Sequence, residues 1–112
     1  MCYHFAMDAL FGSTNRTDIL VAVARLGETY VAELGRLLAL RPTEVVRALS
    51  SLERAGVVAT KRLGNTRVVR LEPRYRAKGE LYALLLRLSE SPRYAGIWAG
   101  VRGRPRAIGK PL

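Results

Sequence analysis

The sequence predicts a mainly α-helical protein that carries one small β-hairpin, and three observations point to this class. Apolar residues recur at helical spacing from about residue 15 to residue 55. After Gly56 the period changes to the alternation typical of strands, over two short runs separated by Leu63-Gly64-Asn65. A leucine-rich helical pattern then follows. With 112 residues, we expect one compact unit with a short appendage.

The first predicted helix begins at Asn15, where a capping side chain with Asp18 three residues later is typical of a helix N-terminus. Its apolar face holds Ile19, Leu20, Val23 and Leu26. Gly27 is expected to end it, because glycine readily adopts the backbone conformation that closes a helix. The following Thr29-Tyr30-Val31 is long enough only for a short edge strand.

Two further helices joined by a short turn predict a helix-turn-helix. The second helix has a stripe of Leu34, Leu37 and Leu38, and the turn is Ala39-Leu40-Arg41. Pro42 suits the first position of the third helix, which needs no backbone N–H there. That helix directs Val45, Ala48, Leu49 and Leu52 inward and ends at Ala55-Gly56.

The hairpin is predicted from strands over residues 57–62 and 66–71, with Pro73 closing the second. A helix follows over residues 77–89, and Ser91-Pro92 begins a last short amphipathic helix whose apolar face is Tyr94, Ile97, Trp98 and Val101. From Arg102 onward the chain is a basic tail. We therefore divide it into residues 1–76 and residues 77–112, the latter holding the C-terminal helices and the tail.

Five segments carry a resemblance to a known family: Leu10-Phe11-Gly12-Ser13 with Arg16 and Ile19-Leu20, Tyr30-Val31-Ala32-Glu33-Leu34, Pro42-Thr43-Glu44-Val45 with Leu49, Leu52-Glu53-Arg54-Ala55-Gly56-Val57-Val58, and Arg62-Leu63-Gly64-Asn65-Thr66-Arg67. The order of elements resembles a winged helix-turn-helix with extra C-terminal helices, and these segments resemble those of small ArsR-like regulators. The resemblance covers about residues 8–88. It implies a homodimer on operator DNA, with the third helix in the major groove and the hairpin, as a wing, on the backbone.

Two departures from that family limit what the resemblance implies. Arg41 stands where these proteins commonly have a Ser or Thr cap. The cysteine-rich motif of the metal-sensing members is absent from residues 32–40, so metal sensing is not carried over.

Charge points to the same class of partner. Nineteen Lys and Arg against nine Asp and Glu give a net charge of +10, which is typical of proteins that meet phosphate in nucleic acid or at an anionic membrane. Residues 41–78 hold ten basic and three acidic side chains, whereas residues 1–40 carry a net charge of −1. We therefore expect the partner to lie against the middle and the tail of the chain.

On the third helix, residues 42–55, helical spacing turns Thr43, Val46, Arg47 and Ser50 outward. Arg47 can bond guanine O6 and N7 as a pair, the hydroxyls can serve bases or phosphates, and Val46 can contact a thymine methyl. The alternative is a solvated helix face with one exposed valine. Glu44 can accept from cytosine or favour the helix N-terminus, and Arg54 can contact phosphate or stabilise the helix end.

In the predicted wing, residues 61–67, Lys61, Arg62 and Arg67 are expected to converge near the tip without a neighbouring acid, and so to contact phosphate. Protection of a strand edge is the alternative. Asn65 is first a turn residue that tolerates positive φ and second a DNA contact. The complete predicted DNA-binding set is Arg41, Thr43, Val46, Arg47, Ser50, Arg54, Lys61, Arg62, Asn65, Arg67, Arg102, Arg104 and Arg106.

The tail carries the last three of those arginines in Arg102-Gly103-Arg104-Pro105-Arg106, which resembles the core of an AT-hook. Such a core lies in a narrow minor groove, where its arginines meet the negative potential. A basic arm that contacts DNA without selecting a sequence is the alternative.

The helix at residues 77–89 is apolar on too many sides for a single surface helix. We expect Leu81, Leu84, Leu85 and Leu88, together with Trp98, to face a second copy of the chain. A helix that serves only the core of its own chain is the alternative. Tyr82, Tyr94 and Trp98 could equally line a ligand pocket, and the sequence does not separate these roles.

The sequence excludes membrane-spanning proteins, disulfide-stabilised scaffolds and zinc fingers. No apolar run reaches the ~18 residues needed to span a bilayer, and the N-terminus lacks a signal-peptide layout. One cysteine, Cys2, allows no internal disulfide, and with His4 it makes at most two metal ligands. We expect a cytoplasmic protein without metal or cofactor, and no membrane partner.

The sequence contains no motif typical of an enzyme: it has no phosphate-binding glycine loop, no G-x-S-x-G motif and no polar carboxylate pair. The sequence therefore predicts a homodimeric transcriptional regulator that binds specific sequences of duplex DNA and is not an enzyme. A winged-helix module that binds a protein, and an RNA-binding protein, are the alternatives. The identity of any small-molecule effector stays open.

Overall fold

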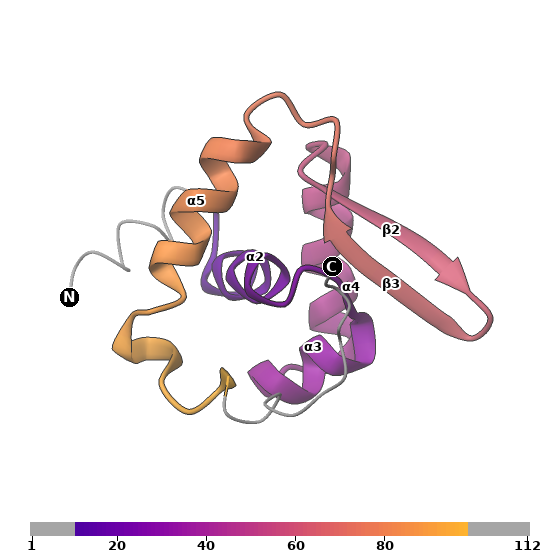
Figure 1. Cartoon of the computed structure of the whole chain (residues 1–112). Coiled ribbons are helices and arrows are strands. Elements are labelled where there is room, and N and C mark those ends of the chain that lie inside the picture. Colours follow the sequence, from indigo (N-terminus) through magenta and orange to yellow (C-terminus); the bar gives the residue numbers. More distant parts are fainter. Residues whose placement is uncertain (1–10, 99–112) are drawn as a thin grey trace.

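The computed structural model describes residues 11–98, which form helices and one antiparallel sheet (Figure 1). In chain order the elements are α2 (Thr14–Leu26), β1 (Thr29–Tyr30), α3 (Val31–Leu38), α4 (Pro42–Arg54), β2 (Val58–Leu63), β3 (Thr66–Leu71), α5 (Lys78–Leu88) and a turn of 3-10 helix, η1 (Pro92–Tyr94). This mixed α/β arrangement with one hairpin is compatible with the predicted order of elements. The predictions for Cys2, His4, Val101, Arg102, Arg104 and Arg106 concern residues outside the described range.

The cap of helix α2 lies two residues earlier than the sequence predicted. The Oγ of Ser13 accepts the backbone N–H of Arg16 at 3.1 Å, so Ser13 is the cap and Asn15 lies inside the helix. The prediction of Asn15 as the cap is therefore wrong. At the other end Gly27 has a φ of 81° and donates its N–H to the carbonyl of Val23 at 2.8 Å, which confirms that it ends the helix.

The turn between α3 and α4 folds back tightly on α3. Ala39 adopts the left-handed conformation (φ 57°), and the N–H of Leu40 donates to the carbonyl of Gly35 at 2.9 Å. A Cβ on Gly35 would lie 3.0 Å from the Leu40 carbonyl oxygen, so glycine permits this close approach. Pro42 is the first residue of α4, as predicted.

The start of α4 uses Glu44 for its own stability. Its Oε1 accepts the backbone N–H of Arg41 at 2.8 Å, three residues before it. This contact supports the interpretation that Glu44 stabilises the N-terminus of the helix.

The hairpin consists of β2 and β3, paired from Val58 opposite Leu71 to Leu63 opposite Thr66, and β1 lies on the other edge of β3. Only Gly64 and Asn65 form the turn, because Leu63 belongs to β2. Gly64 has the positive φ (63°), while Ala39 is the one non-glycine residue with positive φ in the described range. Asn65 is thus a turn residue, as predicted, and the positive φ of the turn falls on Gly64. Figure 1 shows the hairpin projecting from the helical body.

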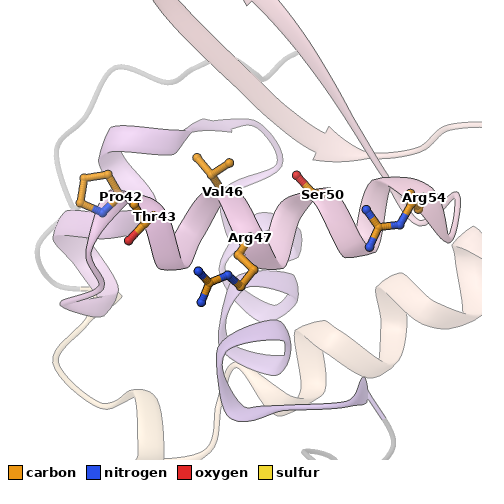
Figure 2. Close-up of a pocket in the computed structure, with 6 residues that line it drawn as sticks. All are labelled: Pro42, Thr43, Val46, Arg47, Ser50 and Arg54. Carbon is orange, nitrogen blue, oxygen red and sulfur yellow. The ribbon is translucent and has the colours of Figure 1, made fainter.

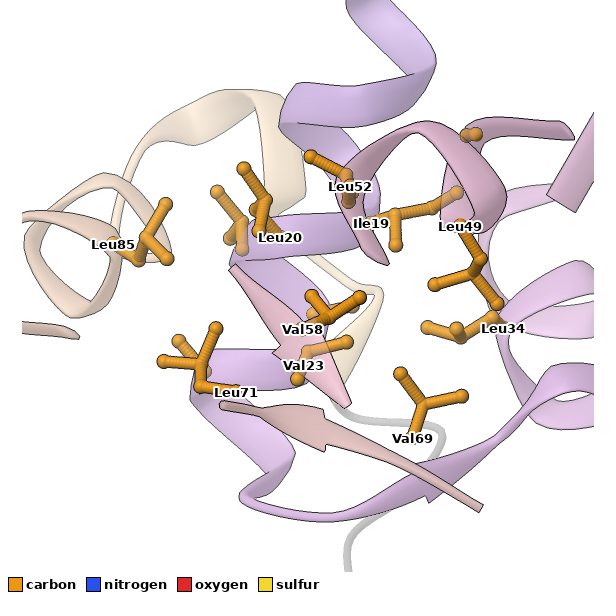
Figure 3. Close-up of a cluster of buried hydrophobic side chains, with 14 of the residues drawn as sticks. Ile19, Leu20, Val23, Leu34, Leu49, Leu52, Val58, Val69, Leu71 and Leu85 are labelled. Carbon is orange, nitrogen blue, oxygen red and sulfur yellow. The ribbon is translucent and has the colours of Figure 1, made fainter. Parts of the chain in front are cut away.

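The core surrounds α2, whose residues 19–24 are all buried. Helix α4 contributes Val45, Ala48, Leu49 and Leu52, which confirms all of its predicted inward residues. Leu34 of α3, together with Val58 and Val69 of the sheet, completes this side of the core (Figure 3). A large buried face on α2 holds α4 and the hairpin in place next to each other.

Helix α5 covers the opposite side of α2 with Leu85 and Leu88, both 0% exposed. Figure 3 shows Leu85 directed toward Leu20 of α2. A side chain that its own chain covers completely offers no surface to a second copy, so placing Leu85 and Leu88 in a dimer interface was wrong. Leu81, Leu84 and Trp98 are half-buried and pack against the same core.

The segment after α5 is a single 3-10 turn rather than the predicted amphipathic α-helix. Gly96 has a φ of 89°, which an α-helix does not accommodate. Ser91 does cap the turn, since its Oγ accepts the N–H of Arg93 at 3.3 Å.

Tyr94 and Trp98 attach this segment to the helical body. Tyr94 is buried, and its hydroxyl donates to Asp18 of α2 at 2.9 Å. The guanidinium of Arg93 donates to the same carboxylate at 2.8 Å. The indole N–H of Trp98 donates to the carbonyl of Ser89 at 2.9 Å. Tyr94 therefore serves the core of its own chain.

Candidate nucleic-acid interface

The outward face of α4 forms a shallow hollow of about 540 Å³ (Figure 2). Its lining comes from this one helix and consists of Pro42, Thr43, Val46, Arg47, Ser50 and Arg54. The core anchors the opposite face of the helix, and helical spacing then leaves these residues outside. Five of them were predicted as one surface, and the structure brings the five together.

The chemistry of this face is varied. Val46 is 38% exposed, so its methyl groups are open to a binding partner. Figure 2 shows Val46 and Ser50 leaving the helix on one side and Arg47 on the other. Within residues 11–98 no acidic side chain pairs with Arg47 or Arg54. The face therefore combines two uncompensated guanidinium groups with hydroxyls and methyl groups.

The cations of the hairpin do not all point the same way. Arg62 lies directly opposite Arg67, whereas Lys61 lies opposite Val68. Because successive side chains of a strand leave opposite faces, Arg62 and Arg67 share one face and Lys61 is on the other. The prediction that the three cations converge is wrong, and only the two arginines lie on the side of α4.

Arg67 also has an acidic neighbour, contrary to the prediction. Its Nη2 lies 3.4 Å from Oε1 of Glu53 in the last turn of α4, and Thr60 donates to Oε2 of the same carboxylate at 2.8 Å. This cluster joins the helix to the hairpin. Sequence reasoning missed Glu53, since it is 14 positions from Arg67 and nothing in the local pattern links the two.

A second hollow of about 680 Å³ lies between α3, the start of α4 and the hairpin, and we call it the wing groove. Its lining includes Tyr30, Arg36, Leu40, Val46, Arg62 and Arg67. Val46 and Pro42 belong to both hollows, so the wing groove continues the outward face of α4. Tyr30, Arg36 and Leu40 were not predicted as surface residues of a site, because only the folding of the hairpin over α3 brings them together.

The remaining predicted residues also reach the surface. Arg41 is exposed at the start of α4, and Asn65 is exposed at the hairpin turn, where it lines the wing groove. Lys61 is exposed on the far side of the hairpin. In the described part of the chain, the predicted DNA-binding residues thus occupy the outward face of α4 and the two faces of the hairpin.

Comparison with known proteins adds no family: no family model and no curated protein matches this chain. In residues 11–98 none of the helices has both the length and the apolar character that a membrane crossing requires. The two hollows and the charges around them are therefore the features from which a function can be inferred.

Proposed function

We propose that this protein is a winged helix-turn-helix regulator of the ArsR-like kind, which binds specific sequences of duplex DNA as a homodimer. Helix α4 enters the major groove, and the β2–β3 hairpin, as the wing, lies on the phosphate backbone. The observation that carries the proposal is the joining of the exposed face of α4 to the arginine-bearing face of the hairpin across Val46.

The outward face of α4 matches what the major groove presents. That groove is wide enough for a helix, and each base pair offers a distinct pattern of donors, acceptors and methyl groups in it. Arg47 reaches guanine O6 and N7 with two parallel hydrogen bonds. Val46 contacts a thymine methyl, and the hydroxyls of Thr43 and Ser50 bond to base edges or phosphates. Arg54 extends the same face toward the backbone.

The hairpin supplies charge rather than base recognition. Arg62 makes no ion pair within the described residues, and Lys61 adds a cation on the other side of the strand. Each such cation that neutralises a phosphate releases a counterion, so binding weakens as salt rises. In this proposal α4 determines the preference for a DNA sequence, and the hairpin contributes affinity for any DNA sequence.

A second copy of the chain would pair through the outer side of α5. With Leu85 and Leu88 in the core, and Leu81 and Leu84 on the same inward stripe, that side holds Tyr82, which is 42% exposed, the exposed Ala83 and the half-buried Leu86. A symmetric pair would present two copies of α4 to one duplex, which requires an inverted repeat in the DNA.

The proposal is tested by selecting bound duplexes from random DNA with the full-length protein. We expect an inverted repeat. Arg47→Ala should then cost about 1–3 kcal/mol at one base position of each half-site and relax the preference there. Arg62→Ala should weaken all sequences alike and reduce the salt slope by about one. Arg74→Ala, which removes an exposed arginine on the loop after β3, is the charge-matched control.

Different outcomes separate the alternatives. Equal binding of duplex RNA would favour an RNA-binding protein. Absence of nucleic-acid binding at low salt would favour a module that binds a protein. If Arg47→Ala leaves the sequence preference unchanged, α4 does not read the major groove. A protein that sediments as a monomer at micromolar concentration contradicts the homodimer.

A further inference from the structure

The wing groove is lined mainly by apolar surface, and it is more enclosed than the hollow on α4 because β1, α3, α4 and the hairpin all contribute to its walls. Its apolar lining residues include Tyr30 of β1, Leu40 of the α3–α4 turn and Val46 of α4. The volume of about 680 Å³ falls within the range of about 300–1,000 Å³ that is usual for small-molecule sites. An apolar hollow with a few polar groups is the form that such sites take.

The polar groups of the wing groove are mainly arginines. Arg36, Arg62 and Arg67 line it, and none of its described lining residues is Asp or Glu. Arg36 has the carboxylate of Glu33 at 3.8 Å, and Arg67 has that of Glu53 at 3.4 Å. Both acids lie outside this groove.

Arg62 is the exception, because it makes no ion pair within residues 11–98. It stands directly opposite Arg67 on the neighbouring strand, and like charges in that position repel. A single anionic group between the two side chains would relieve this repulsion and balance the one uncompensated charge. The groove therefore matches an apolar body that carries one negative charge.

We propose that the wing groove binds a small amphipathic anion, an aromatic body with one carboxylate or sulfonate group. The anionic group contacts Arg62 and Arg67, and the ring system lies against Tyr30, Leu40 and Val46. Charge-assisted hydrogen bonds to a planar guanidinium fix the orientation of the anion.

The ligand has a regulatory consequence, which rests on the proposed function. Val46, Arg62 and Arg67 are also members of the proposed DNA surface. A molecule seated in the wing groove covers one wall of the recognition face and occupies the arginines of the wing. Anion binding and DNA binding therefore exclude each other.

The test uses two fluorescent probes with the full-length protein. One is 8-anilinonaphthalene-1-sulfonate, an aromatic body with one sulfonate, and the other is N-phenyl-1-naphthylamine, the same body without the charge. We expect one sulfonate probe to bind per chain, about tenfold more tightly than the neutral probe. Arg62→Ala should remove that preference, and Tyr30→Ala should weaken both probes. Arg76→Ala, which removes an exposed arginine outside the groove, should change neither.

Far-UV circular dichroism of each variant confirms that the fold is retained. Equal affinity for both probes, or equal loss in Arg62→Ala and Arg76→Ala, would overturn the proposed site. The mutual exclusion of anion and DNA is tested by measuring the affinity for a selected duplex in the presence of the sulfonate probe. With the probe at about ten times its own Kd, competition should raise the apparent Kd for DNA about tenfold. Unchanged DNA affinity would overturn the exclusion alone. A protein that binds the probe but no DNA would overturn the proposed function and leave the anion site standing.

Discussion

Replacing Leu85 by Ala tests whether α5 serves the core of its own chain or the surface of a pair. Leu85 is fully buried and lies against Leu20 of α2 (Figure 3). The substitution removes the Cγ atom and both Cδ methyl groups, and it introduces no new polar group. The cost therefore comes from lost apolar burial and from the cavity that remains.

The magnitude follows from the complete burial of this side chain. Loss of transfer free energy amounts to about 2.4 kcal/mol, at about 0.8 kcal/mol for each buried carbon group. The cavity raises the total to about 3–4 kcal/mol. With a denaturant slope of about 1.5 kcal/mol/M, the midpoint in urea should fall by about 2 M. A domain with a stability of about 5–15 kcal/mol survives this loss in water.

The assay is urea unfolding followed by far-UV circular dichroism at two protein concentrations, with sedimentation of the folded variant. Tyr82→Ala on the outer side of α5 is the matched control. It should change the stability of the single chain by less than about 0.5 kcal/mol. The core placement is refuted if Leu85→Ala leaves the free energy of unfolding unchanged but converts a dimer to monomers.

Three further predictions concern the α3–α4 turn, the helix–hairpin link and the C-terminal segment. Ala39→Gly should raise stability by about 0.5–1 kcal/mol in thermal melts, because glycine adopts φ of 57° without a steric penalty; a lower melting temperature would contradict this. Glu53→Gln should increase DNA affinity several-fold and steepen the salt slope by up to about one, since Arg67 then becomes available to phosphate; a decrease would mean that Glu53 serves to position the hairpin. Asp18→Asn should lower stability by about 1.5–3 kcal/mol in chemical denaturation, because its carboxylate accepts from Arg93 and Tyr94, and an unchanged midpoint would argue against that contact.

Local periodicity by itself determined most of the secondary structure. The bounds of α4, the burial of Val45 and Leu49, and the end of α2 at Gly27 all follow from residues within one or two turns of each other. The change of period after Gly56 likewise predicted the hairpin. These features depend on backbone preferences and on spacing along one element, which a single sequence carries directly.

The sequence also carries the pattern that separates the cations of the hairpin. Lys61 and Arg62 are neighbours in a strand, so alternation alone places them on opposite faces. The surface that faces α4 therefore includes Arg62 and Arg67 but not Lys61, as the register of the hairpin requires.

Only the tertiary structure decided which apolar face is covered and by what. The sequence favoured a dimer interface for the leucines of α5, with the core as the alternative, whereas the packing of α5 on α2 buries Leu85 and Leu88 within the chain. The ion pair between Glu53 and Arg67 and the wing groove join elements that are distant in sequence. Such features depend on how whole elements pack against one another, because the same side chain is core or surface according to what lies across from it.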